Sequence, residues 1–453
     1  MKNVFLGMML SATALTVSAA TSITGVTAAQ NPQTGNVDIV YDLVGDDAIV
    51  TLDDILMDGV SIGPSNVTTV VGHVARKVLA GTGRTIVWNV RKDLPGRELT
   101  GSLEAKLTAW PVGNPPDYMM VRLDCVGVTN FNNVFWYASA ANLPDGGLTN
   151  LVYRLSRYVM RRIPAKNVVW RMGVSAFTTD AAGSTSQYAG AAPHYVKLSA
   201  DYYIGIYPVT FGHHRAMVGS IPRLLASGAS DETPISLCNH ATGNGYSDFN
   251  YAILRGSING WPVNGHALGS GAVLSTYRKV MGLEVDLPTD AQWEFAARAG
   301  SSKKFGVNGG TDSAGTSAAP NFWCTDTISS SLPRPPGLLK PNAWGIYDMN
   351  GNIWEWCLDQ YGATWTSETD NWYANAYNQQ METYNGSTVY VDPVGMNLAT
   401  GADSDKLRVI RGGSVSNGSN NALSSFRHNQ AGDRTTTNSG YGGVRLVCPV
   451  PSL

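Results

Sequence analysis

The sequence predicts an α+β fold in two unequal parts, a small all-β sandwich followed by a larger, irregular domain. Three observations support this prediction. Short β-branched and aromatic segments, separated by turn residues, fill the first third of the chain. From residue 169 onward glycine and tryptophan, which total 49 and 12 in the whole chain, become frequent and regular periodicity becomes scarce. Helical patterns are few and short, because glycine at this density destabilises long helices.

The composition of the 453-residue chain excludes several classes of protein. Its net charge is −2 and charged residues make up 15%, below the roughly 25% of an average soluble protein. No nucleic-acid partner is expected, because nucleic-acid binders carry a basic surplus or stripe. Disorder of the whole chain is excluded, since 43% hydrophobic residues can form large cores.

Residues 1–20 are predicted to be a secretory signal peptide. Lys2 provides the positive start, residues 4–17 are mostly apolar, and small residues around Ala19 offer a cleavage site. A buried N-terminal strand is the alternative. The apolar run is shorter than the ~20 residues of a membrane-spanning helix, and later apolar runs are interrupted. We therefore expect an exported protein (periplasmic, at the cell surface or secreted) without a transmembrane segment.

Residues 36–145 are predicted to form the β-sandwich. The clearest candidate strands are residues 37–44, 48–52, 85–90 and 106–110, which are bounded by Gly, Pro and Asp. Short strands with turn signals between them are typical of a small sandwich. No cluster of histidine, carboxylate or serine in this part indicates a functional site.

Residues 146–168 are predicted to be an amphipathic linker helix. Leu151, Leu155 and Val159 recur at helical spacing with arginines between them, and Pro164 would end the helix. The arginines are interpreted as a solvated face or as a clamp between the two parts of the protein.

Three helices are predicted within the larger domain at residues 169–450. Residues 273–281 show one apolar face. The clearest helix begins at Thr289, where Gln292 completes a capping box, and extends to Arg298. Another begins at Thr210, after a strand.

The motifs of this domain, taken in order, resemble those of the formylglycine-generating enzyme family, also called sulfatase-modifying factors. They occupy residues 170–173, 194–198, 203–210, 287–300, 342–356, 408–414 and 443–446. The resemblance implies an irregular α+β fold of the C-type-lectin-like kind. It does not by itself imply an activity, because one fold family hosts different functions.

The resemblance implies where catalysis would occur. In the oxidases of this family, two cysteines after the Gly-Gly-Ser motif bind Cu(I) and activate oxygen, which converts a sulfatase cysteine to formylglycine. Cu(I) favours thiolate ligands. Asn417 and Ala422 stand at those positions, and no cysteine lies between Cys357 and Cys448. No copper is therefore expected, and the interpretation leans towards a protein that is not an enzyme.

Two other interpretations stay open. One is a metal-dependent oxidase, of the formylglycine-generating or the non-haem iron type. An iron site of the latter type needs two histidines and a carboxylate that converge. The chain lacks the H-x-x-x-H-x-E pattern of the iron-dependent branch of the family, and its histidines are scattered. The other interpretation is an architectural component of an envelope.

The resemblance also implies a structural calcium site in the Gly-Asn-x-Trp-Glu-Trp region. The matching ligands are the side chains of Asp348 and Glu355 and the backbone carbonyls of Gly351 and Ile353. Hard oxygen ligands of both kinds suit Ca²⁺. The alternative is that Glu355 is a buried acceptor for arginine and backbone donors.

Residues 411–446 are predicted to line a polar groove that binds a ligand. The segment is rich in Asn, Ser, Thr and Tyr, which are typical of adaptable binding surfaces. The candidate ligand-binding residues are Ser416, Asn417, Ser419, Asn420, Asn421, Ser424, His428, Asn429 and Tyr441. The segment also resembles that of the variable proteins of diversity-generating retroelements. We expect an unidentified protein, peptide or glycan as the ligand; an irregular loop that covers the core is the alternative.

The five cysteines leave the disulfide pattern open. None is spaced as C-x-x-C, and an odd number leaves at least one thiol free or paired between chains. Because Cys357 and Cys448 flank family motifs of the core, a disulfide between them is one hypothesis.

Overall fold

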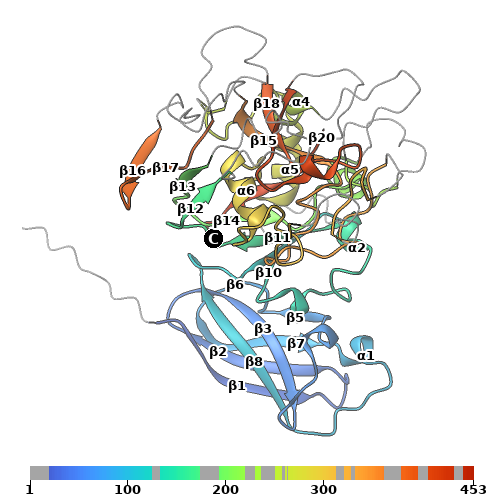
Figure 1. Ribbon diagram of the computed structural model, residues 1–453. Coiled ribbons are helices and arrows are strands. Elements are labelled where there is room, and N and C mark those ends of the chain that lie inside the picture. The colour runs from blue at the N-terminus through green and yellow to red at the C-terminus, as the bar shows by residue number, and fades with distance from the viewer. Residues whose placement is uncertain are drawn as a thin grey trace, which may run out of the picture.

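The computed structural model describes most of the chain from Ala20 to Ser452. The described residues are 20–124, 133–173, 193–219, 230–235, 250–257, 261–262, 264–312, 321–327, 332–361, 379–395, 407–432 and 442–452. Within them the protein is mostly β-sheet with few helices, as expected (Figure 1). The predicted signal peptide falls outside them apart from Ala20. In this part of the chain, no helix combines the length and hydrophobicity needed to cross a membrane.

The N-terminal part of the protein consists of two antiparallel sheets. The first has the order β1 (Ser22–Gln30), β2 (Val37–Val44), β7 (Gly81–Trp88) and β5 (Val70–Gly72). In the second, β3 (Ala48–Met57) pairs with β4 (Val60–Ser61), β6 (Arg76–Val78) and β8 (Leu103–Pro111). Two single turns, η1 (Pro64–Asn66) and α1 (Val90–Asp93), lie in the loops.

One hydrophobic core joins these two sheets. Val37, Ile39 and Tyr41 alternate along β2 with more exposed residues, and they are buried against Val50 of β3. This period of two is what a strand with one covered face requires. The all-β character of this part is as expected, while its classification as a sandwich stays a prediction.

The described residues of the second part form three sheets. The five-stranded sheet has the order β10 (Val134–Tyr137), β9 (Tyr118–Arg122), β11 (Arg157–Ile163), β14 (Tyr202–Gly205) and β21 (Val447–Pro449). A four-stranded sheet has the order β12 (Val169–Met172), β13 (His194–Lys197), β17 (Ser387–Val391) and β16 (Gln380–Tyr384). The other has the order β19 (Arg427–Ala431), β18 (Leu407–Arg411), β15 (Trp354–Gln360) and β20 (Gly442–Gly443).

The prediction of a linker helix at residues 146–168 is wrong. Only one helical turn forms there, α2 (Val152–Leu155), and β11 follows as a central strand. The arginines of β11 do not form a solvated helix face, because they bind carboxylates of neighbouring segments. The pairs are Arg157 with Asp124 and Asp145, Arg161 with Asp117, and Arg162 with Asp201.

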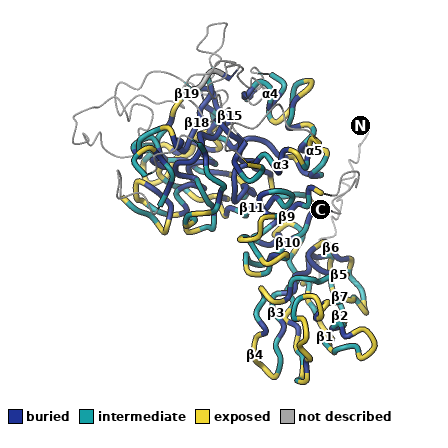
Figure 2. Tube along the Cα trace, turned by 90° about the vertical axis from the view of Figure 1, so that its right-hand side faces the viewer, coloured by how far each residue is buried: buried dark blue, intermediate teal, exposed yellow. Residues whose placement is uncertain are grey.

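The boundary between the two parts also differs from the prediction. Strands β9 and β10 lie within residues 36–145, yet β9 pairs with β11 and β10 pairs with β9, so both belong to the second part (Figure 2). The strands of the first part therefore end with β8, at Pro111.

The predicted helices of the larger domain are confirmed. Helix α6 (Asp290–Arg298) begins with the capping box of Thr289 and Gln292. Helix α5 (Val273–Met281) ends at Gly282 in the left-handed conformation, and α3 (Phe211–Val218) is capped by Thr210. A further short helix is α4 (Tyr251–Arg255).

The core of the second part lies around β15, β18 and α6. Figure 2 shows these strands as a buried region. Every residue of β15 is buried, including Trp354 and Trp356. Because both faces of this strand are covered, charged side chains on it must find partners inside the protein.

Candidate functional site

Arg445 lies fully buried at the centre of the second part and joins four segments. Its Nη2 donates to Glu355 Oε1 of β15 at 2.7 Å and to the carbonyl of Tyr347 at 2.9 Å. Its Nη1 donates to the carbonyl of Gly205 at 2.8 Å, and Trp293 Nε1 of α6 donates to Glu355 Oε2 at 2.7 Å. Charge-assisted bonds of this kind fix the geometry of the segments that they connect.

A second buried ion network connects α6 to the C-terminal segment. Arg411, at the end of β18, pairs with Asp290 and with Glu294, and all three side chains are 0% exposed. Its Nη1 donates to the carbonyls of Ser424 and Phe426, at 3.2 and 2.9 Å. Nearby Arg427 pairs with the other oxygen of Asp290. The arginines therefore hold the segment after β18 against α6.

Two glycines turn the chain directly after Arg411. Gly412 and Gly413 have φ values of 93° and 73°, which favour glycine. A Cβ on Gly413 would lie 2.8 Å from the carbonyl oxygen of Asn421, and one on Gly412 would lie 3.2 Å from Trp293. The Gly-Gly-Ser motif thus lets the next residues pack against both α6 and the turn η7 (Ser419–Ala422).

The nine predicted ligand-binding residues differ in exposure. Ser416 and His428 are exposed, and Asn417, Asn420, Asn421 and Asn429 are half-buried. We call these six residues the C-terminal polar surface. Tyr441 lies outside the described residues. The side chains of Ser419 and Ser424 are buried, so the prediction that they contact a ligand is not supported.

Ser424 serves the fold instead. Its hydroxyl accepts a hydrogen bond from the backbone N–H of Gly306 at 3.1 Å and another from Asn350 Nδ2 at 3.2 Å. Similarly, the N–H of Ser419 donates to Asp326 at 2.7 Å. The sequence showed hydroxyl groups in this segment, but it did not show which of them face inward.

Aromatic side chains that the sequence analysis missed adjoin the C-terminal polar surface. The ring of Trp354 lies 5.3 Å from that of His428 and 6.1 Å from that of Phe426. Trp354 is buried, Phe426 is half-buried and His428 is exposed, so the three rings lead from the core to solvent. The sequence offered one signal for this cluster: Trp354 stands next to Glu355 in a motif shared with the family.

The two positions of the copper cysteines have other roles here. The side-chain carbonyl of Asn417 accepts hydrogen bonds from Trp354 Nε1 at 2.9 Å and from the Ser414 hydroxyl at 2.6 Å. Ala422 is 1% exposed and packs in a small cluster that includes Phe322 and Cys324. Neither position offers a sulfur atom or a free metal ligand.

Comparison with known families identifies the second part of the protein. Residues 160–448, more than half of the chain, match the family described as "Sulfatase-modifying factor enzyme 1-like domain". The chain belongs to this family. The resemblance inferred from the sequence motifs is therefore confirmed, and the family domain begins within β11.

Curated relatives of this chain include formylglycine-generating enzymes and one protein whose name calls it inactive. The chain is 34% identical over 96 residues to a formylglycine-generating enzyme of Thermomonospora curvata. The aligned region covers 17% of this chain and 28% of that enzyme. It is 30% identical over 135 residues to that of Streptomyces coelicolor (28% and 35% covered). It is 31% identical over 107 residues to the "Inactive C-alpha-formylglycine-generating enzyme 2" of Bos taurus (18% and 33% covered). The chain thus matches about a third of the length of these relatives.

Solved structures similar to this protein include a variable protein. "Treponema denticola variable protein 1" aligns with 65% of this chain and 95% of its own, at 20% identity and a TM-score of 0.43. "PvdO from Pseudomonas aeruginosa" aligns with 64% of this chain and 94% of its own, at 18% identity and a TM-score of 0.41.

The two carboxylates of the predicted calcium site accept hydrogen bonds from protein groups. Both oxygens of Glu355 accept hydrogen bonds from Arg445, and Oε2 also accepts one from Trp293. Burial raises the pKa of Asp348 to about 6, and its Oδ2 accepts from the N–H of Gly337. In this arrangement the Arg445 guanidinium occupies both oxygens of Glu355, which is the alternative considered for this residue, and the calcium site itself stays a prediction.

The described cysteines are buried free thiols, which corrects the hypothesis of a Cys357–Cys448 disulfide. The two residues lie in different hydrophobic clusters. Burial raises the pKa of Cys324, raises that of Cys357 well above its usual range and raises that of Cys448 to about 12. Protonated thiols are poor metal ligands. Among the described residues, no three or more His, Cys, Asp or Glu side chains are grouped to hold a metal ion.

The stability of the family domain is predicted to depend on pH through Asp359. Burial, together with the charge of Asp290, raises the pKa of Asp359 to about 7 in the folded protein. In the unfolded chain the pKa of Asp359 is about 3.9. The stability that the raised pKa contributes is therefore fully present below pH 3.9 and is lost as the pH rises through 7. Asparagine cannot ionise but can still accept the hydrogen bond from the Asp290 N–H.

Asp359→Asn should therefore gain in melting temperature relative to the natural protein between pH 5 and 8, by ~2 °C or more. Thermal melts of both proteins measure the difference, in which the pH dependence of groups that do not interact with Asp359 cancels. Parallel curves over this range would contradict the prediction.

Proposed function

We propose that this protein is an exported binding module without catalytic activity, which binds a protein, peptide or glycan through its C-terminal polar surface. The observation that carries the proposal is the environment of Asn417 and Ala422. The first is bonded to Trp354 and Ser414, and the second is enclosed among apolar side chains. Thiolates at both places are what Cu(I) chemistry would need.

The chemistry of the surface supports binding. Apart from His428, its members are serine and asparagine side chains, which are short and uncharged, and the rings of Trp354 and Phe426 lie beside His428. Aromatic anchors surrounded by adaptable amides are typical of binding surfaces that select their ligands without catalysis. The backbone beneath is held by the pairs of Arg411, so the surface is rigid enough to be specific.

The absence of catalysis has a direct test. The purified protein, loaded with Cu(I), is incubated with a Cys-x-Pro-x-Arg peptide and oxygen, and mass spectrometry follows formylglycine formation. No conversion is expected. Conversion would refute the proposal and would restore an oxidase as the function.

Binding through the surface is tested with His428→Ala. Binders of the whole protein are first selected from a displayed peptide library and from a glycan array. Because His428 is exposed, its replacement should change the free energy of unfolding by less than ~0.5 kcal/mol. It should lower the affinity of the protein for the selected ligands by ~5-fold or more, as expected for loss of an aromatic contact in an interface.

His73→Ala is the matched control, because His73 is an exposed histidine of the N-terminal part. It should leave the same binders unaffected. If His428→Ala and Asn429→Ala both bind every selected ligand as the natural protein does, the surface is not the binding site.

A further inference from the structure

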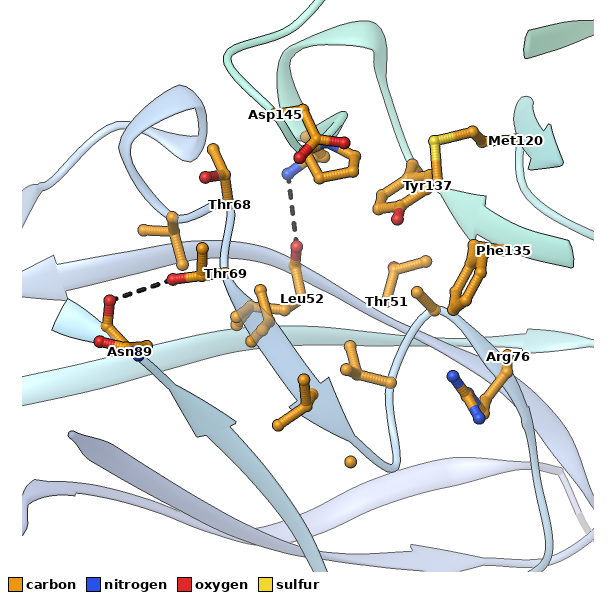
Figure 3. Close-up of a pocket in the computed structure, with 18 of the residues that line it drawn as sticks. Thr51, Leu52, Thr68, Thr69, Arg76, Asn89, Met120, Phe135, Tyr137 and Asp145 are labelled. Atoms are coloured by element: carbon orange, nitrogen blue, oxygen red, sulfur yellow. Dashed lines mark hydrogen bonds between the residues drawn. The ribbon is translucent and has the colours of Figure 1, made fainter. Parts of the chain in front are cut away.

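A cavity of about 500 Å³ lies where the two parts of the protein meet. Its walls come from β3, β5 and β6 of the N-terminal sheets and from β9, β10 and the loop after η2 (Ala140–Asn142). Figure 3 shows Thr68 and Thr69 on one side, with Phe135 and Tyr137 on the other. We call this cavity the junction cleft. Its volume is within the range of ~300–1,000 Å³ that is typical of ligand sites.

One wall of the junction cleft is the free edge of a β-sheet. Strand β5 is the last of its sheet and pairs only with β7 among the described strands. The N–H of Asn89 donates to Thr69, and the N–H of His73 donates to Thr85. Along an antiparallel strand, the backbone N–H and C=O of successive residues point alternately towards and away from the partner strand. Residues 69, 71 and 73 therefore bond to β7. The backbone groups of Val70 and Gly72 consequently point away from β7, and both residues line the cleft.

This edge offers backbone hydrogen bonds to an extended chain. The carbonyl of Gly72 accepts from the N–H of Val74, whereas no described backbone group bonds to the outer N–H and C=O of Val70. Three residues of β5 span ~10 Å, the length of a short added strand. Exposed edges of this kind recruit extended peptides by β-strand addition.

The charge of the junction cleft selects the kind of peptide. Four basic side chains and one carboxylate line it: Arg76, Lys92, Arg122, Arg157 and Asp145. Two of the four are neutralised, because Asp124 pairs with Arg122 and Arg157, and Asp145 pairs with Arg157. Arg76 and Lys92 form no ion pair with a described carboxylate, so the cleft carries an excess of positive charge.

Arg76 is placed to receive a carboxylate. Its guanidinium stacks on the ring of Phe135 at 5.2 Å from the ring centroid, which holds it at the cleft (Figure 3). No carboxylate of the described residues pairs with its N–H groups. The floor of the cleft is apolar, with Leu52, Val67 and Val74 nearly buried. A strand with alternating apolar and acidic side chains matches both features.

We propose that the junction cleft binds an extended acidic peptide segment of a partner protein, which adds as a strand to β5 and pairs its carboxylate with Arg76. This site is separate from the C-terminal polar surface, so it does not rest on the function proposed for that surface. It also gives the N-terminal part a role, because β5 and β10 line the cleft from the two parts of the protein, which meet where β10 contacts β3 and β6.

The test uses the whole protein and a displayed library of random hexapeptides. Peptides are selected on the natural protein and then counter-selected on Arg76→Glu, and the survivors are synthesised with a fluorescent label. We expect peptides that carry Asp or Glu and that lose at least 10-fold in affinity for Arg76→Glu. Replacing their acidic residue by lysine should weaken binding to the natural protein and restore it to Arg76→Glu. Arg97→Glu, an exposed site outside the cleft, should bind them unchanged.

The backbone contact has its own variants. Val70→Pro removes only an N–H that points away from β7, so the sheet should keep its ladder, and Val70→Ala controls for the lost side chain. The Val70→Pro variant should bind at least 10-fold more weakly than Val70→Ala at an equal melting temperature. The proposal is overturned if no Arg76-dependent acidic peptide is selected, if the two Val70 variants bind alike, or if a neutral oligosaccharide such as cellohexaose displaces the peptides from the cleft.

Discussion

Replacing Arg411 with methionine is expected to destabilise the second part of the protein by ~3–5 kcal/mol, because it leaves buried carboxylates without their cation. Asp290 and Glu294 are both 0% exposed, and the charge of Arg411 is among the main causes that keep their pKa values low. Methionine fills a similar length with an apolar chain, so the loss would come from charge and hydrogen bonds rather than from a cavity. Urea unfolding followed by tryptophan fluorescence measures it.

Arg298→Met is the matched control for Arg411→Met. Arg298 also pairs with Glu294, at 2.7 Å, but its side chain is 13% exposed and water can replace part of the interaction. Arg298→Met should therefore lower the free energy of unfolding by clearly less than Arg411→Met does. A triple variant, Arg411→Met with Asp290→Asn and Glu294→Gln, removes the orphaned charges and should recover part of the loss. If Arg411→Met is no more destabilising than Arg298→Met, the network is not a main support of the domain.

Arg411→Met should also weaken ligand binding at the C-terminal polar surface. Arg411 donates to the carbonyls of Ser424 and Phe426, so its loss frees the backbone that carries His428. In folded protein at low temperature, Arg411→Met should therefore weaken the ligands selected on that surface, while acidic peptides in the junction cleft should bind as before. This difference separates a local effect on one site from general unfolding.

Local signals in the sequence predicted those elements whose reasons are local. Thr289 and Gln292 form a capping box within four residues, and Gly412 and Gly413 have φ values that other residues rarely adopt. Such features act through the backbone of their own segment, so the surrounding fold does not change their meaning. The start of α6 could therefore be located without a structure, and the two glycines offered the same kind of local signal for the turn after β18.

The prediction at residues 146–168 failed because apolar spacing was given more weight than the partners of the arginines. Tyr158 and Met160 fit a strand as well as a helix, and the strand wins since Arg157, Arg161 and Arg162 each meet an aspartate on a neighbouring segment. Those aspartates are distant in sequence or lie in turns. Only tertiary pairing decides between the two structures, and a single sequence does not contain it.

The candidate sites were predicted unequally for a related reason. The sequence identified the C-terminal segment and the missing thiols, but it did not separate exposed Ser416 from buried Ser424, since both are serines in the same irregular stretch. The junction cleft left no signal at all. Its walls include Val70, Arg76 and Phe135, which are ordinary residues until two sheets bring them together.

Replacing Glu355 with alanine is expected to be at least as damaging as the loss of Arg411. Arg445 would keep its carbonyl acceptors at Gly205 and Tyr347 but would lose its only charged partner among the described residues, and Trp293 Nε1 would lose its acceptor. Breaking a buried pair in this way costs ~3–5 kcal/mol. Glu355→Gln retains one oxygen acceptor and should cost less than alanine, though it still leaves the guanidinium without a counter-charge.

A double-mutant cycle separates the pair from a general effect of each residue. Arg445→Met alone leaves Glu355 as a buried, unpaired carboxylate and should be as destabilising as Glu355→Ala. Together the two substitutions should cost little more than either one, which corresponds to a coupling free energy of ~3 kcal/mol or more. Additive losses would contradict the central role assigned to this pair.

The same variants decide between the two roles considered for Glu355. If the residue serves Arg445, the cost of Glu355→Gln is the same in excess Ca²⁺ as in a chelator, because no metal is released. If it instead ligates calcium, the natural protein melts at a higher temperature in Ca²⁺ and Glu355→Gln abolishes that gain. We expect the first result: both oxygens of Glu355 already accept hydrogen bonds from Arg445, and a divalent cation would have to displace a guanidinium that is itself buried and bonded to two carbonyls.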